Sequence, residues 1–217
     1  YNDIGEIDET SVDYLDFVDG EYNPGLTGNI LSPYDLVLGL SFAKQITDKF
    51  HYGVTAKYAR EDLVRESAES FLFDFGLIYE TGFRTLTTAA VVRNFGPEIK
   101  FINESFPPPQ TLVISLSADI IAPGNSLIWT NENQKLHAAL EIMGPRDYDQ
   151  QYNAGLEWSY NDLFFIRSGY KFNYDAQGFS VGFGLVFRSV TGDYSYAGYG
   201  DYLGSIHRFN VGFTLNR

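Results

Sequence analysis

The side chains best suited to acid–base chemistry at neutral pH are the three histidines, His51, His137 and His207. They stand in separate stretches, and none has a serine or carboxylate at the spacing of a catalytic set. The sequence also contains no HExxH zinc motif, no glycine-rich phosphate loop and no cysteine. We therefore expect no enzyme activity, no cofactor and no metal centre.

Several stretches of the chain have an apolar residue at every second position. A set of charged residues stands at the positions between them. Because strand side chains alternate between two faces, these charges fall on the face opposite the apolar one. The members are Lys57, Asp74, Arg93, Asp119, Glu141, Glu157, Arg167, Lys171 and Arg208. We interpret them as lining an ion-paired polar interior; the alternative is a conduit or ligand site built from the same charges.

The first part of the chain is acidic, because Lys44 is its first basic residue. We predict that residues 10–33 form a long acidic loop, rich in Asp, Asn and Gly, and that it is a candidate partner-binding loop. Its carboxylates are Asp13, Asp16, Asp19 and Glu21. They could bind Ca²⁺, but the spacing of an EF-hand is absent. The formal net charge of -13 argues against a nucleic-acid partner.

The elements that carry these residues repeat one pattern, which is clearest over residues 179–187. There Phe, Val, Phe, Leu and Phe alternate with Ser, Gly, Gly and Val. This period of two predicts a strand with one apolar face and one small, mostly polar face. The expected strands are 34–45, 50–60, 70–80, 86–94, 111–121, 134–143, 152–160, 163–173, 178–188, 192–198 and 207–215.

Many such strands in series predict an all-β fold: a transmembrane, antiparallel, up-and-down β-barrel forming a single domain over residues 1–217. Aromatic residues make up 17% of the chain, which suits the aromatic girdles of a barrel in the outer membrane of a bacterial cell. In such a barrel, we expect the three histidines to be polar residues of the lumen or of its rim. A soluble β-sandwich is the competing fold, and it would bury the aromatic faces in a second sheet.

The connections alternate between short and long, as they do between the periplasmic and extracellular sides of such barrels. This alternation places 10–33 outside the cell, and 122–133 is a long exception on the periplasmic side. Residues 95–110 contain several prolines, so we expect an irregular segment there. The chain opens on Tyr1 without an initiator Met or a signal peptide, so we expect upstream strands and about 14 strands in the full protein.

The order and spacing of several stretches resemble the PorV/PorQ family of outer-membrane proteins, which is itself similar to FadL-type barrels. The stretches are YDLVLGLSFAKQITDKFHYGVTAKYAR (34–60), VVRNFGPEIKF (91–101), ESFPP (104–108), YNAGLEWSYNDLFFIRSGYKFNYDAQGFSVGFGLVF (152–187) and IHRFNVGFTL (206–215). The resemblance implies a FadL-like outer-membrane barrel without catalytic residues. It also implies a protein-binding component of type IX secretion or cell-surface assembly in a Bacteroidota-like bacterium.

That role implies contact with outer-membrane lipid and with a secretion translocon or the C-terminal domains of secreted cargo. Two other functions stay open on the sequence. One is a FadL-like transporter of hydrophobic small molecules, which would need an apolar interior pocket. The other is a structural, porin-like barrel, which would conduct ions.

Overall fold

The computed structural model describes residues 1–18, 21–64, 66–101, 104–200 and 204–214. The regular elements in these ranges are all β-strands, which confirms the all-β prediction. Within the same ranges, no helix is both long enough and apolar enough to cross a membrane.

The strands follow one another closely along the chain. They are β1 (Asn2–Asp3), β2 (Ile7–Val18), β3 (Glu21–Leu31), β4 (Tyr34–Thr47), β5 (Phe50–Asp62), β6 (Ser67–Glu80), β7 (Thr87–Phe95), β8 (Ile99–Phe101), β9 (Glu104–Phe106), β10 (Thr111–Ala122), β11 (Trp129–Thr130), β12 (Gln134–Pro145), β13 (Gln151–Tyr160), β14 (Phe164–Phe172), β15 (Phe179–Phe187), β16 (Val190–Gly198) and β17 (Ser205–Phe213). Each stretch predicted as a strand between residues 34 and 215 overlaps one of them, although residue 215 itself lies outside the described residues.

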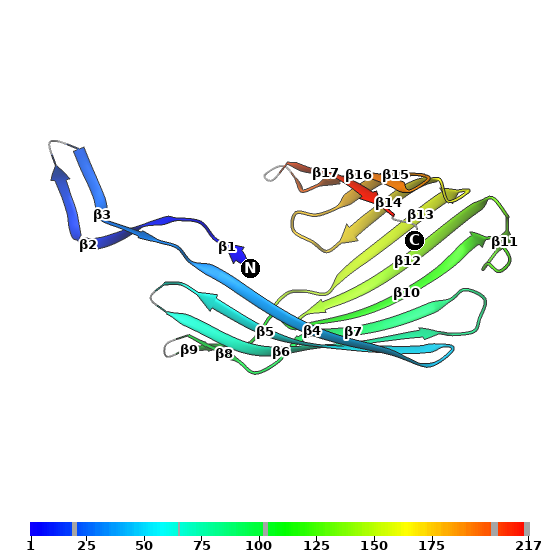
Figure 1. Cartoon of the computed structure of the whole chain (residues 1–217), viewed down its shortest axis with the longest axis horizontal. Coiled ribbons are helices and arrows are strands. Elements are labelled where there is room, and N and C mark those ends of the chain that lie inside the picture. Colours follow the sequence, from blue (N-terminus) through cyan, green and yellow to red (C-terminus); the bar gives the residue numbers. More distant parts are fainter. Residues whose placement is uncertain (19–20, 65, 102–103, 201–203, 215–217) are drawn as a thin grey trace. The chain divides into compact units, whose positions relative to one another are not determined.

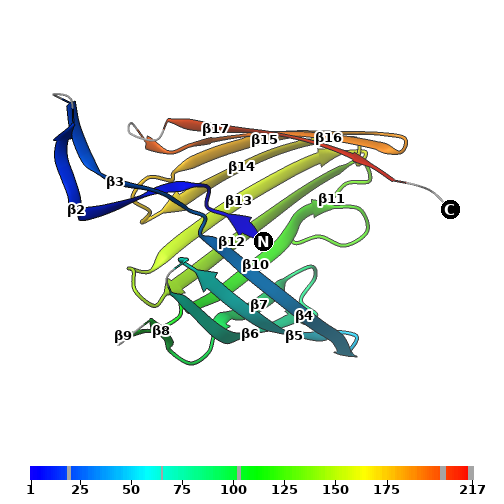
Figure 2. The ribbon, with the colours of Figure 1, turned by 60° about the vertical axis from the view of Figure 1, so that its left-hand side comes forward.

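One sheet of 13 strands holds most of the chain, in the order β1-β4-β5-β6-β7-β10-β12-β13-β14-β15-β16-β17, with the short β11 paired in parallel to β10. Figures 1 and 2 show β10 and β12 to β17 lying side by side in sequence order. This is an antiparallel, up-and-down arrangement. No pairing joins the two ends of the order among the described residues, so the sheet is established and a closed barrel is not.

Two segments predicted as irregular contain strands, and both expectations were wrong. Within 10–33, β2 and β3 form a hairpin that pairs from Ile7 opposite Leu31 to Val18 opposite Glu21. Register shifts interrupt this pairing, so the strict alternation that marks the other strands is lost from the sequence. Within 95–110, β8 and β9 form a short hairpin before the prolines.

The chain divides into two compact units. One comprises Tyr1–Phe42, Thr55–Asp74 and Asn94–Pro108; the other comprises Ala43–Val54, Phe75–Arg93 and Pro109–Arg217. The second unit contains β10 to β17 and carries most of the predicted charged set. Its hairpin turn at Asn161-Asp162 is confirmed: both residues have positive φ, of 51° and 53°, as a two-residue type I′ turn requires.

The strands of the second unit have two unlike faces. On the apolar face, Leu140 of β12, Leu156 of β13 and Phe183 of β15 are 57%, 50% and 43% exposed. The opposite face carries small and charged residues. In the described part of the whole chain, the buried hydrophobic side chains are few and small to medium in size: Ala68, Leu72, Val113, Ala118 and Ala122.

Candidate functional site

The candidate site is the polar face of β10 to β17 in the second unit. Cross-strand pairing aligns one row of residues across these strands, each directly opposite the next. In strand order the row is Asp119, His137, Glu157, Arg167, Gly182, Ser195 and Arg208. We call it the charged row. The predicted residues on these strands therefore share a face, and several of them share a single line across it.

Arg167 is the centre of the charged row. Its Nε donates to Glu157 Oε2 at 2.6 Å, and its Nη1 donates to Asp193 Oδ1 at 2.6 Å. All three side chains are partly exposed, by between 36% and 40%. Glu157 lies on the neighbouring strand, whereas Asp193 lies on β16, two strands away. The sequence prediction included Glu157 and Arg167 and missed Asp193.

Glycines on β15 allow Arg167 to cross to β16. A Cβ placed on Gly184 would lie 2.8 Å from Asp193 Oδ1 and 3.1 Å from Arg167 Nη1, and one on Gly182 would lie 3.5 Å from Arg167 Cβ. Side chains at these two positions would occupy the path of the guanidinium. The alternation of glycine with apolar residues in β15 was the signal that could have located this crossing.

Asp119 begins a second polar group at the other end of the charged row. Its carboxylate lies 2.7 Å from His137 Nδ1 and 3.4 Å from Lys135 Nζ. The β10–β7 pairing ends at Ser117, so backbone groups of Asp119 lie beyond this ladder. The Thr85 hydroxyl accepts from the Asp119 N–H at 3.0 Å and donates to the Asp119 carbonyl at 3.1 Å, and this carbonyl also accepts from the Leu127 N–H at 2.8 Å. These contacts satisfy the Asp119 backbone past the end of the β7 pairing.

Other predicted residues on this face make separate contacts. Glu141 accepts a hydrogen bond from Asn153 Nδ2 at 2.8 Å. Lys171 donates to the Gln177 side-chain oxygen and lies 5.0 Å from the centre of the Tyr174 ring. Arg93 of β7 pairs in register with Thr111 and is exposed.

Lys57 and Asp74 belong to the first unit, where they form an ion pair of their own. Lys57 Nζ lies 2.7 Å from Asp74 Oδ1 and donates to Asn94 Oδ1 at 2.6 Å. The Asn94 backbone N–H donates to the same Asp74 oxygen at 2.8 Å. Asn94 has a φ of 55°, so this triangle also holds a residue in the left-handed region.

A pocket of about 330 Å³ opens on the polar face of β14 to β17. Its charged lining residues among those that the structure describes are Arg167, Lys171 and Arg208, and none of them is acidic. Glycines and serines form much of the rest of its wall. The sequence prediction contained all three cations without grouping them, because their closeness depends on the register of four strands.

The candidate partner-binding segment is the β2–β3 hairpin. Asp13 is exposed on β2, Asp16 pairs in register with Asn23, and Glu21 pairs with Val18. Asp19 lies outside the described residues. A contact that sequence reasoning missed joins the two strands: Glu9 Oε2 accepts from Thr27 Oγ1 at 2.9 Å and from Asn29 Nδ2 at 2.8 Å.

The histidines do not converge. His51 Nε2 lies 3.6 Å from Glu80 Oε1, and His137 contacts Asp119. His207 is on the apolar face of β17, where Tyr194 Oη lies 2.9 Å from its Nδ1, so its expected place in a lumen or rim does not fit this face. In the described part of the chain, no three of the His, Asp and Glu side chains gather as a metal ion would require.

No model of a protein family matches the sequence, and the curated proteins contain no match. The function must therefore be argued from the two faces of the sheet, the polar contacts and the hairpin.

Proposed function

We propose that this chain is the wall of an outer-membrane β-barrel that binds protein partners in type IX-type secretion or cell-surface assembly. The observation that carries the membrane part of this proposal is the uncovered apolar face of the sheet. The β2–β3 hairpin and the resemblance to the PorV/PorQ family support the partner-binding part.

The apolar face is too extensive for a free aqueous surface. Along β17 alone, Phe209, Val211 and Phe213 are exposed by 79%, 63% and 74%. Water-soluble monomers rarely expose contiguous apolar patches of more than a few hundred Å². A bilayer would cover this face at no hydrogen-bonding cost, because antiparallel pairing satisfies the backbone of the inner strands.

The polar face suits the inside of such a barrel. The bridge from Glu157 through Arg167 to Asp193 compensates charge without a neighbouring layer of protein. Charged and small residues on this face favour water, an internal segment or a polar ligand over a hydrophobic one. The face therefore gives little support to a transporter of hydrophobic small molecules.

The β2–β3 hairpin suits contact with another protein. Val12 and Tyr14 of β2 are 80% and 55% exposed, and Asp13 between them is also exposed. Exposed apolar and tyrosine side chains are typical of the centre of protein interfaces. The surrounding carboxylates favour a partner with a basic surface.

A cross-linking experiment in the native outer membrane tests this role. A photoreactive residue at position 12 or 14 should capture a secretion partner, and Val12→Ser with Tyr14→Ser should remove that partner from pull-downs and reduce secretion. Ile128→Ser is the matched control, because Ile128 is 75% exposed in the connection between β10 and β12. Unchanged pull-down and secretion after deletion of residues 12–31 would refute the role of the hairpin.

A further inference from the structure

We propose that the pocket on the polar face of β14 to β17 binds a small organic anion through its carboxylate or phosphate group. Arg167, Lys171 and Arg208 line the pocket, and no acidic residue in the described part of the chain lines it. This is unexpected in a chain with 28 acidic and 15 basic residues, where cations have many possible acidic partners. The site does not depend on which protein partner the hairpin binds.

Two of the three cations have no acidic partner. Among the described residues, no carboxylate lies within ion-pair distance of Lys171 or Arg208; Lys171 instead donates to the neutral side chain of Gln177. Arg208 is exposed at the end of the charged row, directly opposite Ser195. Their charges are therefore available to an anion that enters the pocket.

Arg167 has a different part in the site. Glu157 and Asp193 compensate its charge and fix its guanidinium through two of its five N–H donors. The remaining donors are held in one orientation by these bonds. Arg167 is therefore a positioned hydrogen-bond donor, whereas Lys171 and Arg208 supply the uncompensated charge.

The space between the cations comes from small residues. Gly169, Ser180 and Ala197 lie directly opposite one another on β14, β15 and β16, in the row next to the charged row. A Cβ on Gly169 would lie 3.0 Å from Ser180 Oγ, so a larger residue there would crowd the hydroxyl. The Ser180 and Ser195 hydroxyls line the pocket as further donors.

The size and wall of the pocket define the ligand class. About 330 Å³ is at the lower end of the range for small-molecule sites. Ala197, on the same polar face, and Tyr199 also line it, so a short carbon chain has apolar contacts beside the polar group. A carboxylate or phosphate on a few carbon atoms fits this wall, and a long hydrocarbon does not.

The test uses the full chain folded in detergent and measures binding by calorimetry. The probes are hexyl phosphate, hexanoate and inorganic phosphate, with hexanol as the uncharged control. We expect the organic anions to bind with an affinity that falls as salt is raised, and hexanol to bind at least about tenfold more weakly. Binding of inorganic phosphate as tight as that of hexyl phosphate would identify a free oxyanion as the ligand; weaker binding would identify an amphipathic one.

Variants locate the binding in this pocket. Lys171→Gln with Arg208→Gln should weaken hexyl phosphate binding by about tenfold or more. Arg93→Gln is the matched control, because Arg93 is an exposed arginine on the polar face that does not line the pocket. Equal binding of hexanol, no binding of any anion, or an equal loss in Arg93→Gln would overturn the proposal. Circular dichroism checks that each variant folds. If the first double variant does not fold, Lys171→Met with Arg208→Met takes its place, and the same loss of binding is expected.

Discussion

Arg167 on β14 reaches past a whole strand to bind Asp193 on β16, with 2.6 Å between Nη1 and Oδ1. The same side chain binds Glu157 on β13, so one guanidinium joins three strands and crosses a fourth. Ladder hydrogen bonds join only neighbouring strands. This bridge therefore adds a link between strands that the backbone does not pair.

The crossing predicts an unusual sensitivity to a side chain at Gly184. Gly184→Val should destabilise the protein by about 1–3 kcal/mol, because its Cβ would lie 2.8 Å from Asp193 Oδ1. Urea unfolding from lipid vesicles measures the change. Gly155→Val is the control, since the nearest atom to a Cβ on Gly155 is Ser168 O at 3.9 Å on the same polar face. Equal losses in both variants would show that Arg167 does not need this path.

The bridge predicts that the contributions of Arg167, Glu157 and Asp193 to stability are energetically coupled. Arg167→Met should destabilise the protein by about 1–2 kcal/mol, a figure reduced for solvent screening because each partner is more than a third exposed. Adding Glu157→Gln and Asp193→Asn should recover part of this loss, because the unpaired carboxylates are then gone. A double-mutant cycle measures the coupling. Additive effects of the single variants would contradict the bridge.

The Lys57–Asp74 pair in the first unit should be the stronger single contact. Its side chains are only 19% and 24% exposed, so solvent screens them less than the Arg167 bridge. Lys57→Met should cost about 1–3 kcal/mol by removing charged hydrogen bonds to Asp74 and Asn94. Lys44→Met, at an exposed lysine of β4, should change stability little. Thermal unfolding measures the change in each variant. Equal unfolding temperatures for Lys57→Met and Lys44→Met would argue against a structural role for the contacts among Lys57, Asp74 and Asn94.

Asp62 predicts a pH-dependent contact at the end of β5, beyond the stretch 50–60 expected to cross the membrane. The pKa of its carboxyl is lowered from the ordinary value, first by the side-chain hydrogen bond from Arg60 and then by the Val64 N–H. A lowered folded-state pKa gives stability that is present above the unfolded pKa and lost as pH falls through the folded one.

The stability difference between the parent chain and Asp62→Asn should therefore persist from neutral pH to the ordinary pKa of an aspartate, and disappear only below it. Unfolding curves collected at successive pH values measure this difference. If the difference vanished at a pH above the ordinary value, the assignment of Arg60 and Val64 as stabilising partners would be wrong.

The sequence was sufficient to predict β4 to β7, β10 and β12 to β17, because each of these strands carries its own period of two. In β15, Phe179, Val181, Phe183, Leu185 and Phe187 lie on the face opposite the charged row, because Arg167 pairs with Gly182. The same pattern placed Glu157, Arg167 and Arg208 on one face without knowledge of their partners. Alternation fixes the face of a residue and says nothing about which residue stands opposite it.

The features that sequence reasoning missed depend on register or on irregular pairing. Asp193 joins Arg167 only because β14, β15 and β16 pair with one particular alignment. The β2–β3 hairpin was mistaken for a loop because its register shifts break the alternation, and Gly25 sits there with a φ of 85°. A Cβ on Gly25 would lie 2.5 Å from Ser11 O, so the irregular pairing at this point of β3 requires glycine.

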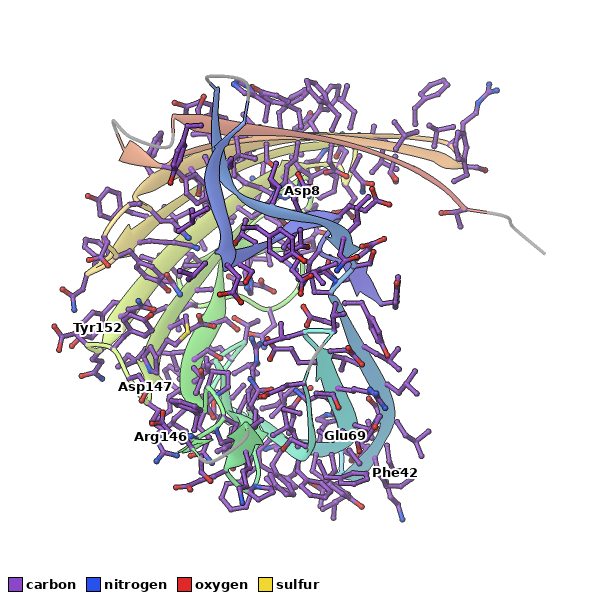
Figure 3. All side chains as sticks on the ribbon, turned by 90° about the vertical axis from the view of Figure 1, so that its left-hand side faces the viewer. Asp8, Phe42, Glu69, Arg146, Asp147 and Tyr152 are labelled. Atoms are coloured by element: carbon purple, nitrogen blue, oxygen red, sulfur yellow. The ribbon has the colours of Figure 1, made fainter. Side chains whose placement is uncertain are left out.

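The central claim, that the apolar face meets lipid and the polar face meets an aqueous interior, is tested most directly by cysteine accessibility in bilayers. The chain contains no cysteine, so single substitutions report on single sites. Leu140→Cys and Ala139→Cys are neighbours on opposite faces of β12. Figure 3 shows the side chains on the ribbon and labels Arg146 and Asp147, which directly follow β12. In reconstituted vesicles, a charged thiol reagent should label Ala139→Cys and leave Leu140→Cys unlabelled. Equal labelling of both positions, or labelling of Leu140→Cys alone, would contradict the account.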